Sequence, residues 1–270
     1  EASGRLPCVL HFECGKGEAC NLGSWWCSML ASLGVVAIQV DTHGPRREYP
    51  GGLEDAICCL QWVHEHLDDL GVSHIVLEGA SSGARISLAL ALWAKRNNKS
   101  DLISGVWVTC PWIGGPAYWE KAEASCLREF DGYLISPVTD AVKELSQSDD
   151  PSRLYDPLCW PYQASFSDVA GLPPHMICVC ELDPLRDEAI TYARKLMHAR
   201  VHCCCRTIIG ALHGGDIFAF EGMEAVTDAL LRDIASFASS LSCGMLHAIA
   251  PTKRKTSTSS TALPGQVQSY

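Results

Sequence analysis

The sequence has few charged residues, a deficit of positive charge and no apolar run of membrane-spanning length. Charged residues make up 19% of the 270 residues, and 21 basic against 31 acidic residues give a formal net charge of −10. This balance argues against nucleic acid as a principal partner. The N-terminal residues EASGRLPCVLHF also lack the basic and then apolar stretches of a secretory signal. We therefore expect a cytoplasmic globular protein without a membrane span.

Cysteine, in contrast, is abundant, with 15 residues. The odd total, the pair Cys58-Cys59 and the triplet Cys203-Cys204-Cys205 do not resemble a disulfide framework. We interpret the cysteines as small buried hydrophobic residues in a reducing compartment. A metal site at residues 202–205 is disfavoured, because consecutive residues of a strand alternate between its faces and cannot converge on one ion. We expect neither a metal nor a cofactor.

Residues 75–92 (IVLEGASSGARISLALAL) organise the rest of the chain. An apolar run typical of a buried strand stops at Gly79, and a helical pattern begins almost at once. The residues between them fit G-x-S-x-G, with Ser81 at the centre and Gly83 at the end. A serine on so sharp a turn has a strained backbone and needs small neighbours, and the turn raises its hydroxyl to the edge of the sheet. Alone the motif is weak, since a tight connection with a spare serine is the simpler interpretation.

Strand-like and helix-like segments alternate along most of the chain. This alternation predicts an α/β fold with a mostly parallel, doubly wound sheet of about six strands. The expected strands are residues 7–12, 35–40, 75–77, 105–109, 175–180 and 203–209, and the expected helices are 25–33, 53–70, 86–92, 186–199 and 216–241. Residues 114–167, which include a helical piece near 140–145, interrupt the pattern as a cap over the site. We expect one domain over residues 1–245 and a disordered, Ser/Thr-rich tail over 246–270.

Two partners for Ser81 follow the last two expected strands. Asp183 comes directly after one strand, and His213 lies in a glycine-rich loop after the other. A serine becomes a nucleophile when a histidine accepts its proton, and the histidine needs a carboxylate to orient it. Each residue also has a simpler interpretation: Asp183 could cap a helix, Asp187 is a rival acid, and His213 could be an ordinary loop histidine. Their agreement in order and position favours the triad.

The chain resembles the hormone-sensitive-lipase-like branch of the α/β-hydrolases, which contains the bacterial family IV esterases. The resemblance covers about residues 7–241. Residues 41–55 (DTHGPRREYPGGLED) look like the D-Y-R-x-x-P-E and P-x-x-x-x-D segments of that branch, and Leu172-Pro173-Pro174 and D-P-L-R-D at 183–187 are characteristic of it. The resemblance implies an α/β-hydrolase fold with Ser81, Asp183 and His213 as nucleophile, acid and base.

The sequence departs from that pattern in three places. Where the family has H-G-G-G, this chain has Glu13-Cys14-Gly15-Lys16, so the oxyanion donors would be the N–H groups of Ser82 and Gly15, with Cys14 as a further candidate. Losing one such donor costs on the order of a hundred- to a thousand-fold in rate. Ala80 replaces the family's aspartate before the serine. The first two family strands are also missing, which leaves residues 35–40 as an apolar edge. A fragment, a divergent gene product and a homodimer that covers this edge are all compatible with this last departure.

Two functional hypotheses follow. The first is a serine carboxylesterase that hydrolyses a small or short-acyl ester, with the cap aromatics Trp112, Tyr118, Trp119 and Tyr133 lining an apolar pocket. The second is a non-catalytic, receptor-like or inactive homologue on the same scaffold, as the plant gibberellin receptors are. The altered loop at Cys14 favours the second hypothesis. The retained order of serine, aspartate and histidine favours the first.

Overall fold

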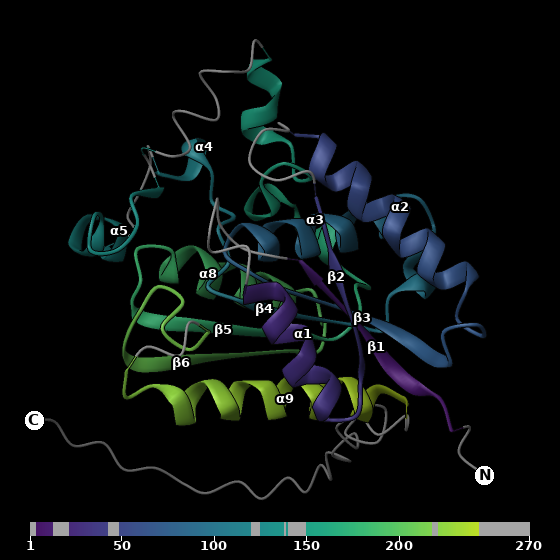
Figure 1. Ribbon diagram of the computed structural model, residues 1–270. Coiled ribbons are helices and arrows are strands. Elements are labelled where there is room, and N and C mark those ends of the chain that lie inside the picture. The colour runs from purple at the N-terminus through teal and green to yellow at the C-terminus, as the bar shows by residue number, and fades with distance from the viewer. Residues whose placement is uncertain are drawn as a thin grey trace, which may run out of the picture.

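The computed structural model describes residues 4–12, 22–42, 49–119, 125–137, 139, 150–217 and 221–242. A six-stranded sheet runs through its centre in the order β2-β1-β3-β4-β5-β6 (Figure 1). Every neighbouring pair of strands is parallel. The strands are β1 (Leu6–Phe12), β2 (Val36–Val40), β3 (Val72–Ala80), β4 (Gly105–Thr109), β5 (His175–Leu182) and β6 (Cys203–Leu212). The predicted parallel α/β sheet is therefore confirmed.

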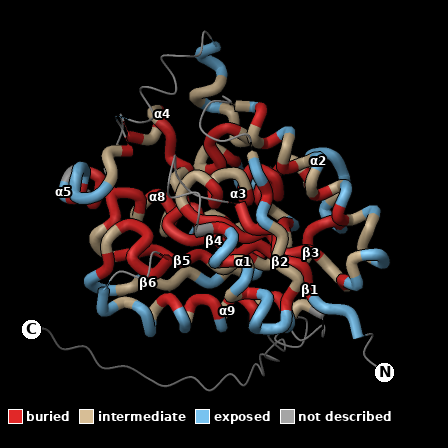
Figure 2. The backbone as a smooth tube through the Cα atoms, viewed as in Figure 1, coloured by how far each residue is buried: buried red, intermediate tan, exposed pale blue. Residues whose placement is uncertain are grey.

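Helices cover both faces of the sheet, as expected when parallel strands are joined by crossover helices. On one face lie α2 (Gly51–Glu65), α3 (Ser82–Arg96) and α8 (Arg186–His198). On the other lie α1 (Leu22–Ser32) and α9 (Glu224–Ser242) (Figure 1). Successive strand residues alternate between the two cores: Leu10 packs with the first set and Val9 with the second. The inner strands β1, β3, β4 and β5 form the buried centre of the molecule (Figure 2).

Two helix boundaries differ most from the prediction. The helix expected over 53–70 ends at Glu65, because the next residues turn back and the N–H of Val72 already bonds to the carbonyl of Leu67 as β3 begins. The last helix, expected from about residue 216, begins at Glu224. Residues 213–217 form turns instead, and Gly214 has a φ of 67°. That left-handed conformation is incompatible with a helix.

Short helices replace the strand–helix alternation between β4 and β5. They are α4 (Pro116–Trp119), α5 (Ser125–Phe130), the 3₁₀ turns Pro151–Tyr155 and Pro161–Gln163, and α7 (Phe166–Val169). The described residues between 114 and 167 thus form short helices, turns and irregular chain where the sequence predicts an interruption. The helical piece expected at 140–145 and the tail expected at 246–270 lie outside the described residues.

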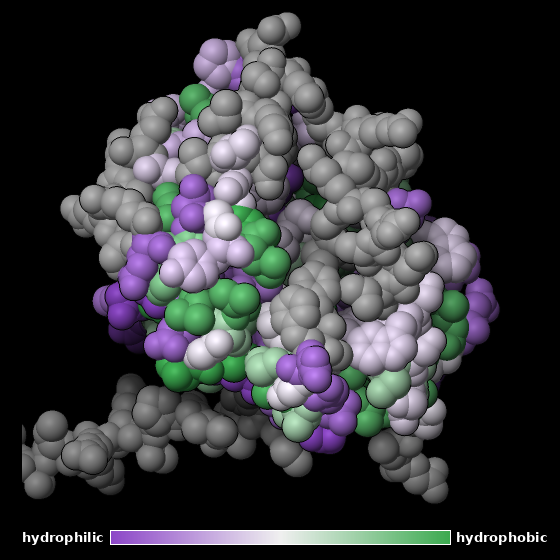
Figure 3. Space-filling model, turned by 60° about the vertical axis from the view of Figure 1, so that its left-hand side comes forward, coloured by the Kyte–Doolittle hydropathy of each residue, from purple (hydrophilic) through white to green (hydrophobic). Residues whose placement is uncertain are grey.

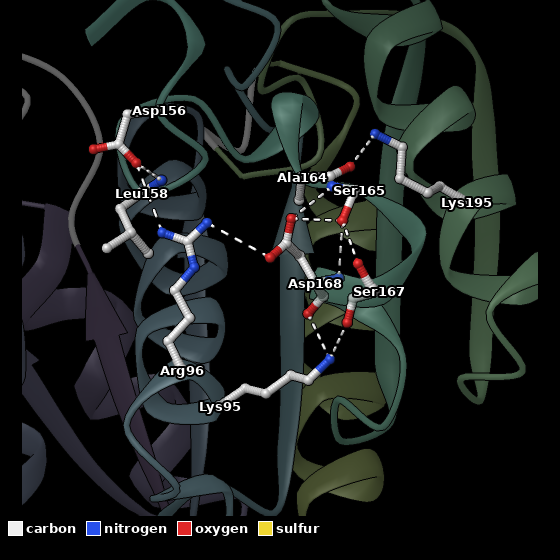
Figure 4. A network of polar contacts seen from close by, with 9 residues as sticks. All are labelled: Lys95, Arg96, Asp156, Leu158, Ala164, Ser165, Ser167, Asp168 and Lys195. Atoms are coloured by element: carbon white, nitrogen blue, oxygen red, sulfur yellow. Dashed lines mark hydrogen bonds and ion pairs between the residues drawn. The ribbon is translucent and has the colours of Figure 1, made fainter. Parts of the chain in front are cut away.

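Basic side chains of α3 and α8 hold the returning end of this segment (Figure 4). The guanidinium of Arg96 lies 3.8 Å from the carboxylate of Asp156 and 3.6 Å from that of Asp168. Lys95 Nζ donates to the carbonyl of Asp168 at 3.0 Å, and Lys195 Nζ donates to that of Ala164 at 2.7 Å. These contacts fix the segment to α3 and α8, two of the helices on that face of the sheet.

The sheet ends at β2 on one side and β6 on the other. The predicted apolar edge is thus an edge of the described sheet, and Val36, Ala37 and Ile38 in it are only partly buried. On the face drawn in Figure 3, the described apolar residues gather in small groups with polar residues between them. Within the described ranges, no helix is long and apolar enough to span a bilayer.

Candidate active site

Ser81 occupies a sharp turn between β3 and α3. Its φ of 51° and ψ of −114° lie outside the regions that non-glycine residues favour. Hydrogen bonds on both sides of the residue hold it there. The N–H of Ser81 donates to the carbonyl of Thr109 at 3.0 Å, and the carbonyl of Ser81 accepts from the N–H groups of Arg85 and Trp112, both at 3.2 Å. The strain predicted from the G-x-S-x-G pattern is thus present at its central serine.

The glycines of the motif let two backbone segments approach closely. A Cβ atom added at Gly79 would lie 2.6 Å from the carbonyl carbon of Gly83 and 2.7 Å from its oxygen. Backbone atoms on the first turn of α3 cannot yield to such a contact. A side chain at position 79 would therefore push β3 away from α3. Ser81 lies at the junction of these two elements.

Ser81, His213 and Asp183, which the sequence places far apart, lie in one line of contacts. His213 Nε2 lies 3.0 Å from Ser81 Oγ, and its Nδ1 lies 2.9 Å from Asp183 Oδ2. Both His213 and Asp183 are buried, with 5% and 0% of their surface exposed. A carboxylate accepts, so Nδ1 carries the imidazole proton and Nε2 can accept one from the serine hydroxyl.

The two aspartates of the D-P-L-R-D segment have different partners. Asp183 Oδ1 accepts from the N–H of Leu185 at 2.9 Å, so this carboxylate both contacts His213 and supports the start of α8. Asp187, the rival acid, accepts from Arg186 Nε at 3.0 Å and from the N–H of Cys126 at 3.2 Å. Burial raises the pKa of Asp187, but the hydrogen bonds from Cys126 and Arg186 outweigh it and lower the pKa.

Of the three expected oxyanion residues, one is described. Ser82 is the first residue of α3 and stands next to Ser81 at the positive end of the helix dipole. Cys14 and Gly15 lie outside the described residues.

A cluster of tryptophans begins one hydrogen bond from Ser81. Trp112, whose N–H bonds to the Ser81 carbonyl, stacks on Trp119 with ring centroids 6.2 Å apart and meets Trp160 edge to face at 5.5 Å. The guanidinium of Arg85 lies 4.7 Å from the Trp112 ring and 4.8 Å from the Trp160 ring. Tyr133, also expected in the pocket, is 64% exposed.

Glu188 is a buried residue that the sequence analysis missed. Its carboxylate accepts from the N–H groups of Ile113 at 2.7 Å and Gly114 at 2.8 Å, and from Trp119 Nε1 at 2.7 Å. Burial raises the pKa of Glu188 to about 8, although these hydrogen bonds oppose the rise. One carboxylate of α8 therefore anchors the segment that carries Trp112 and Trp119. Its position directly after D-P-L-R-D is the sequence feature that could have indicated a role near the site.

A parallel sheet with a strained serine at a strand–helix turn, followed by an aspartate and a histidine after later strands, defines the α/β-hydrolase class. The family described as alpha/beta hydrolase fold matches residues 17–216, and the chain belongs to it.

Similar proteins of this class include several esterases. The chain is similar to a structure titled brefeldin A esterase, a bacterial homologue of human hormone sensitive lipase. The TM-score is 0.83 and the identity 34%, over 89% of this chain and 70% of that one. This likeness confirms the predicted resemblance to the hormone-sensitive-lipase-like branch.

Curated relatives give a similar picture. An arylesterase of Saccharolobus solfataricus is 30% identical over 75% of this chain and 66% of the relative. The carboxylesterase NlhH of Mycobacterium tuberculosis is 30% identical over 75% of this chain and 63% of the relative. The chain thus spans slightly less than two thirds of the length of these two relatives.

Proposed function

We propose that this chain is a serine carboxylesterase that hydrolyses small or short-acyl esters. The contact of His213 with both Ser81 and Asp183 carries the proposal, because it supplies a base for the serine hydroxyl and an orienting acid for the base. The names of the similar proteins, which include an arylesterase and a carboxylesterase, agree with this chemistry.

The first half of the reaction acylates Ser81. His213 Nε2 takes the hydroxyl proton while Ser81 Oγ attacks the acyl carbon and the carbonyl oxygen becomes an oxyanion. Asp183 stabilises the imidazolium that forms. The imidazolium then gives its proton to the alkoxide as the bond between carbonyl carbon and alcohol oxygen breaks. The alcohol leaves, and an ester of Ser81 remains.

The second half returns the enzyme to its starting state. His213 takes a proton from a water molecule, whose oxygen attacks the acyl carbon, and then returns that proton to Ser81 Oγ as the acid leaves. In both halves the N–H of Ser82, with those of Gly15 and Cys14, would bind the oxyanion. The dipole of α3 favours negative charge at that place.

The cap aromatics suit a small apolar substrate. The backbone N–H of Trp112 bonds to the backbone carbonyl of Ser81, and the ring of Trp112 packs with Trp119 and Trp160. Because Glu188 accepts a hydrogen bond from Trp119, this group of three tryptophans is anchored to α8. We infer that it limits the length of the acyl chain beside Ser81.

Hydrolysis of p-nitrophenyl esters tests this function. Acetate and butyrate esters are compared with a decanoate, for the wild type and for Ser81→Ala, after circular dichroism has shown both to be folded. We expect turnover of the short esters by the wild type alone and a decline toward decanoate. A folded wild type no faster than Ser81→Ala would overturn the esterase proposal and favour the ligand-binding hypothesis.

We further propose a cytoplasmic location and a homodimer formed through the β2 edge. No disulfide joins two cysteines within the described ranges, in agreement with a reducing compartment. An edge strand with unpaired backbone groups can pair with a second copy. Sedimentation over a hundredfold range of protein concentration tests the dimer, and a constant monomer mass would contradict it.

A further inference from the structure

Three potential metal ligands converge beneath the proposed catalytic residues. Cys110 follows β4, Cys180 lies in β5, and Asp216 lies in the turn after β6. Their ligand atoms all lie within 4.8 Å of one another, and the residues are 1%, 0% and 0% exposed. Because they come from three separate segments, an ion bound by all three would join the ends of neighbouring strands.

Two of the three separations between these atoms are close to the edges of a tetrahedral site. Cys110 Sγ and Cys180 Sγ are 3.5 Å apart, and Cys180 Sγ is 3.7 Å from Asp216 Oδ1. Zinc binds thiolate sulfur at about 2.3 Å and carboxylate oxygen at about 2.0–2.2 Å. A tetrahedron with these bond lengths has edges of about 3.8 Å between two sulfurs and about 3.6 Å between sulfur and oxygen.

One carboxylate oxygen of Asp216 has no hydrogen-bond donor among the described residues. This oxygen, Oδ2, is buried. Buried ionised carboxylates are costly unless they are paired or coordinate a metal. A cation bound to Asp216 would compensate the charge of this carboxylate.

Cys110 has an unusual backbone as well. Its φ of 47° is in the left-handed region, which few non-glycine residues adopt. Such conformations are costly and tend to occur at functional positions. The side chain of Cys110 faces Cys180. It also faces Asp183 and His213, because the potential ligand atoms of Cys110, Asp183 and His213 lie within 4.8 Å of one another. Asp183 and His213 already contact each other, so the unused acceptor belongs to Asp216.

We propose that Cys110, Cys180 and Asp216 form a site for a thiophilic divalent cation of the zinc class, with a water molecule as the fourth ligand. On binding, the two thiol protons leave for solvent and the two thiolates and the carboxylate coordinate the ion. The net charge of the cluster is then minus one, as it is when Asp216 alone is ionised. The ion therefore adds little charge beside His213. It fixes the turn that carries both Asp216 and His213, and it does so whether or not the chain is an esterase.

The site differs from the metal site that the sequence analysis disfavoured. Cys203 and Cys205 are half-buried and Cys204 is exposed, as expected for alternating residues of β6. This triplet supplies the matched control, because it presents thiols to adventitious metal without bringing them together.

Cobalt(II) and zinc(II) are the probes. The full chain is reduced, stripped with a chelator and titrated with cobalt(II), then back-titrated with zinc(II). We expect one ion per chain, with thiolate-to-cobalt charge-transfer absorption and the strong d–d absorption of a tetrahedral site. Asp216→Asn and Cys180→Ser should each weaken binding by at least about tenfold, whereas the variant C203S/C204S/C205S should bind like the wild type.

Thermal unfolding gives a second measurement that does not depend on activity. At a free zinc concentration about a hundred times Kd, the melting temperature of the wild type should rise by about 5–10 °C, and that of Asp216→Asn should rise far less. Binding that survives in Asp216→Asn and Cys180→Ser but disappears in C203S/C204S/C205S would overturn the proposal. Wild-type protein without the charge-transfer absorption would overturn it too.

Discussion

Asp183 Oδ2 lies 2.9 Å from His213 Nδ1, and this carboxylate has no exposed surface. Asp187, four positions along the chain, instead contacts Arg186 and the backbone of Cys126. Asp183 therefore contacts the histidine, whereas Asp187 contacts an arginine and a backbone N–H. Isosteric substitutions can distinguish these two roles.

Asp183→Asn should lower kcat by about 10⁴-fold, because an amide can hold the imidazole in the wrong tautomer. Asp187→Asn is the matched control, and it should leave kcat near the wild-type value. Its expected cost is about 1.5–3 kcal/mol of unfolding free energy, for weakened hydrogen bonds to a charged group. Esterase rates and urea unfolding of both variants provide the check. Equal losses of kcat would mean that Asp183 has no special part in the reaction.

Ser81→Gly should be more stable than Ser81→Ala by about 1 kcal/mol or more. Both variants lack the hydroxyl group, but only glycine adopts a φ of 51° without strain. We expect neither variant to hydrolyse esters. Urea unfolding of the two proteins measures the difference, and an alanine variant as stable as the glycine variant would show that the turn stores no strain.

Gly79→Ala should destabilise the protein by about 3 kcal/mol or more, since the new Cβ would meet backbone atoms of Gly83 at 2.6 Å. Gly52→Ala is the control. A Cβ there would lie 3.5 Å or more from its neighbours, within α2, where alanine is the better helix former. That variant should be neutral or up to about 1 kcal/mol more stable. Similar losses in both would contradict the close contact of strand and helix.

His175 should make the protein sensitive to acid. It is 1% exposed, its Nδ1 donates to the carbonyl of Pro173 at 2.7 Å, and burial lowers its pKa from 6.5 to about 4. Between these two values the unfolded chain binds more protons than the folded one, so the contribution of His175 is present above pH 6.5 and is lost as the pH falls toward 4.

Between pH 7 and pH 4.5, the titration of His175 should lower the free energy of unfolding by about 2–3 kcal/mol. Urea unfolding at both values, for the wild type and for His175→Gln, isolates this part because glutamine does not titrate. The wild type should lose more stability than the variant over that interval. Parallel pH profiles would contradict the lowered pKa.

Sequence alone predicted the features that depend on local patterns. Ser81, Asp183 and His213 each follow a strand, and in a parallel sheet all such ends meet at one edge. The contacts that sequence could not predict join residues that only packing brings together. Cys110 and Cys180 are 70 positions apart, and no sequence motif connects them. The position of Arg85 between two tryptophans and the anchoring role of Glu188 likewise depend on how the chain folds over α3 and α8.

The pairing of α9 with the first strands has a consequence during translation. Val9 and Trp26 are buried in the same core as Leu230 and Ile234, near the other end of the described chain. A ribosome that has made β1, α1 and β2 has therefore exposed an apolar surface whose cover will be synthesised about two hundred residues later. At about 5–20 residues per second, this interval lasts about 10–40 s. Until α9 emerges, the face that it will cover remains an apolar surface of the kind that makes incomplete chains prone to aggregate.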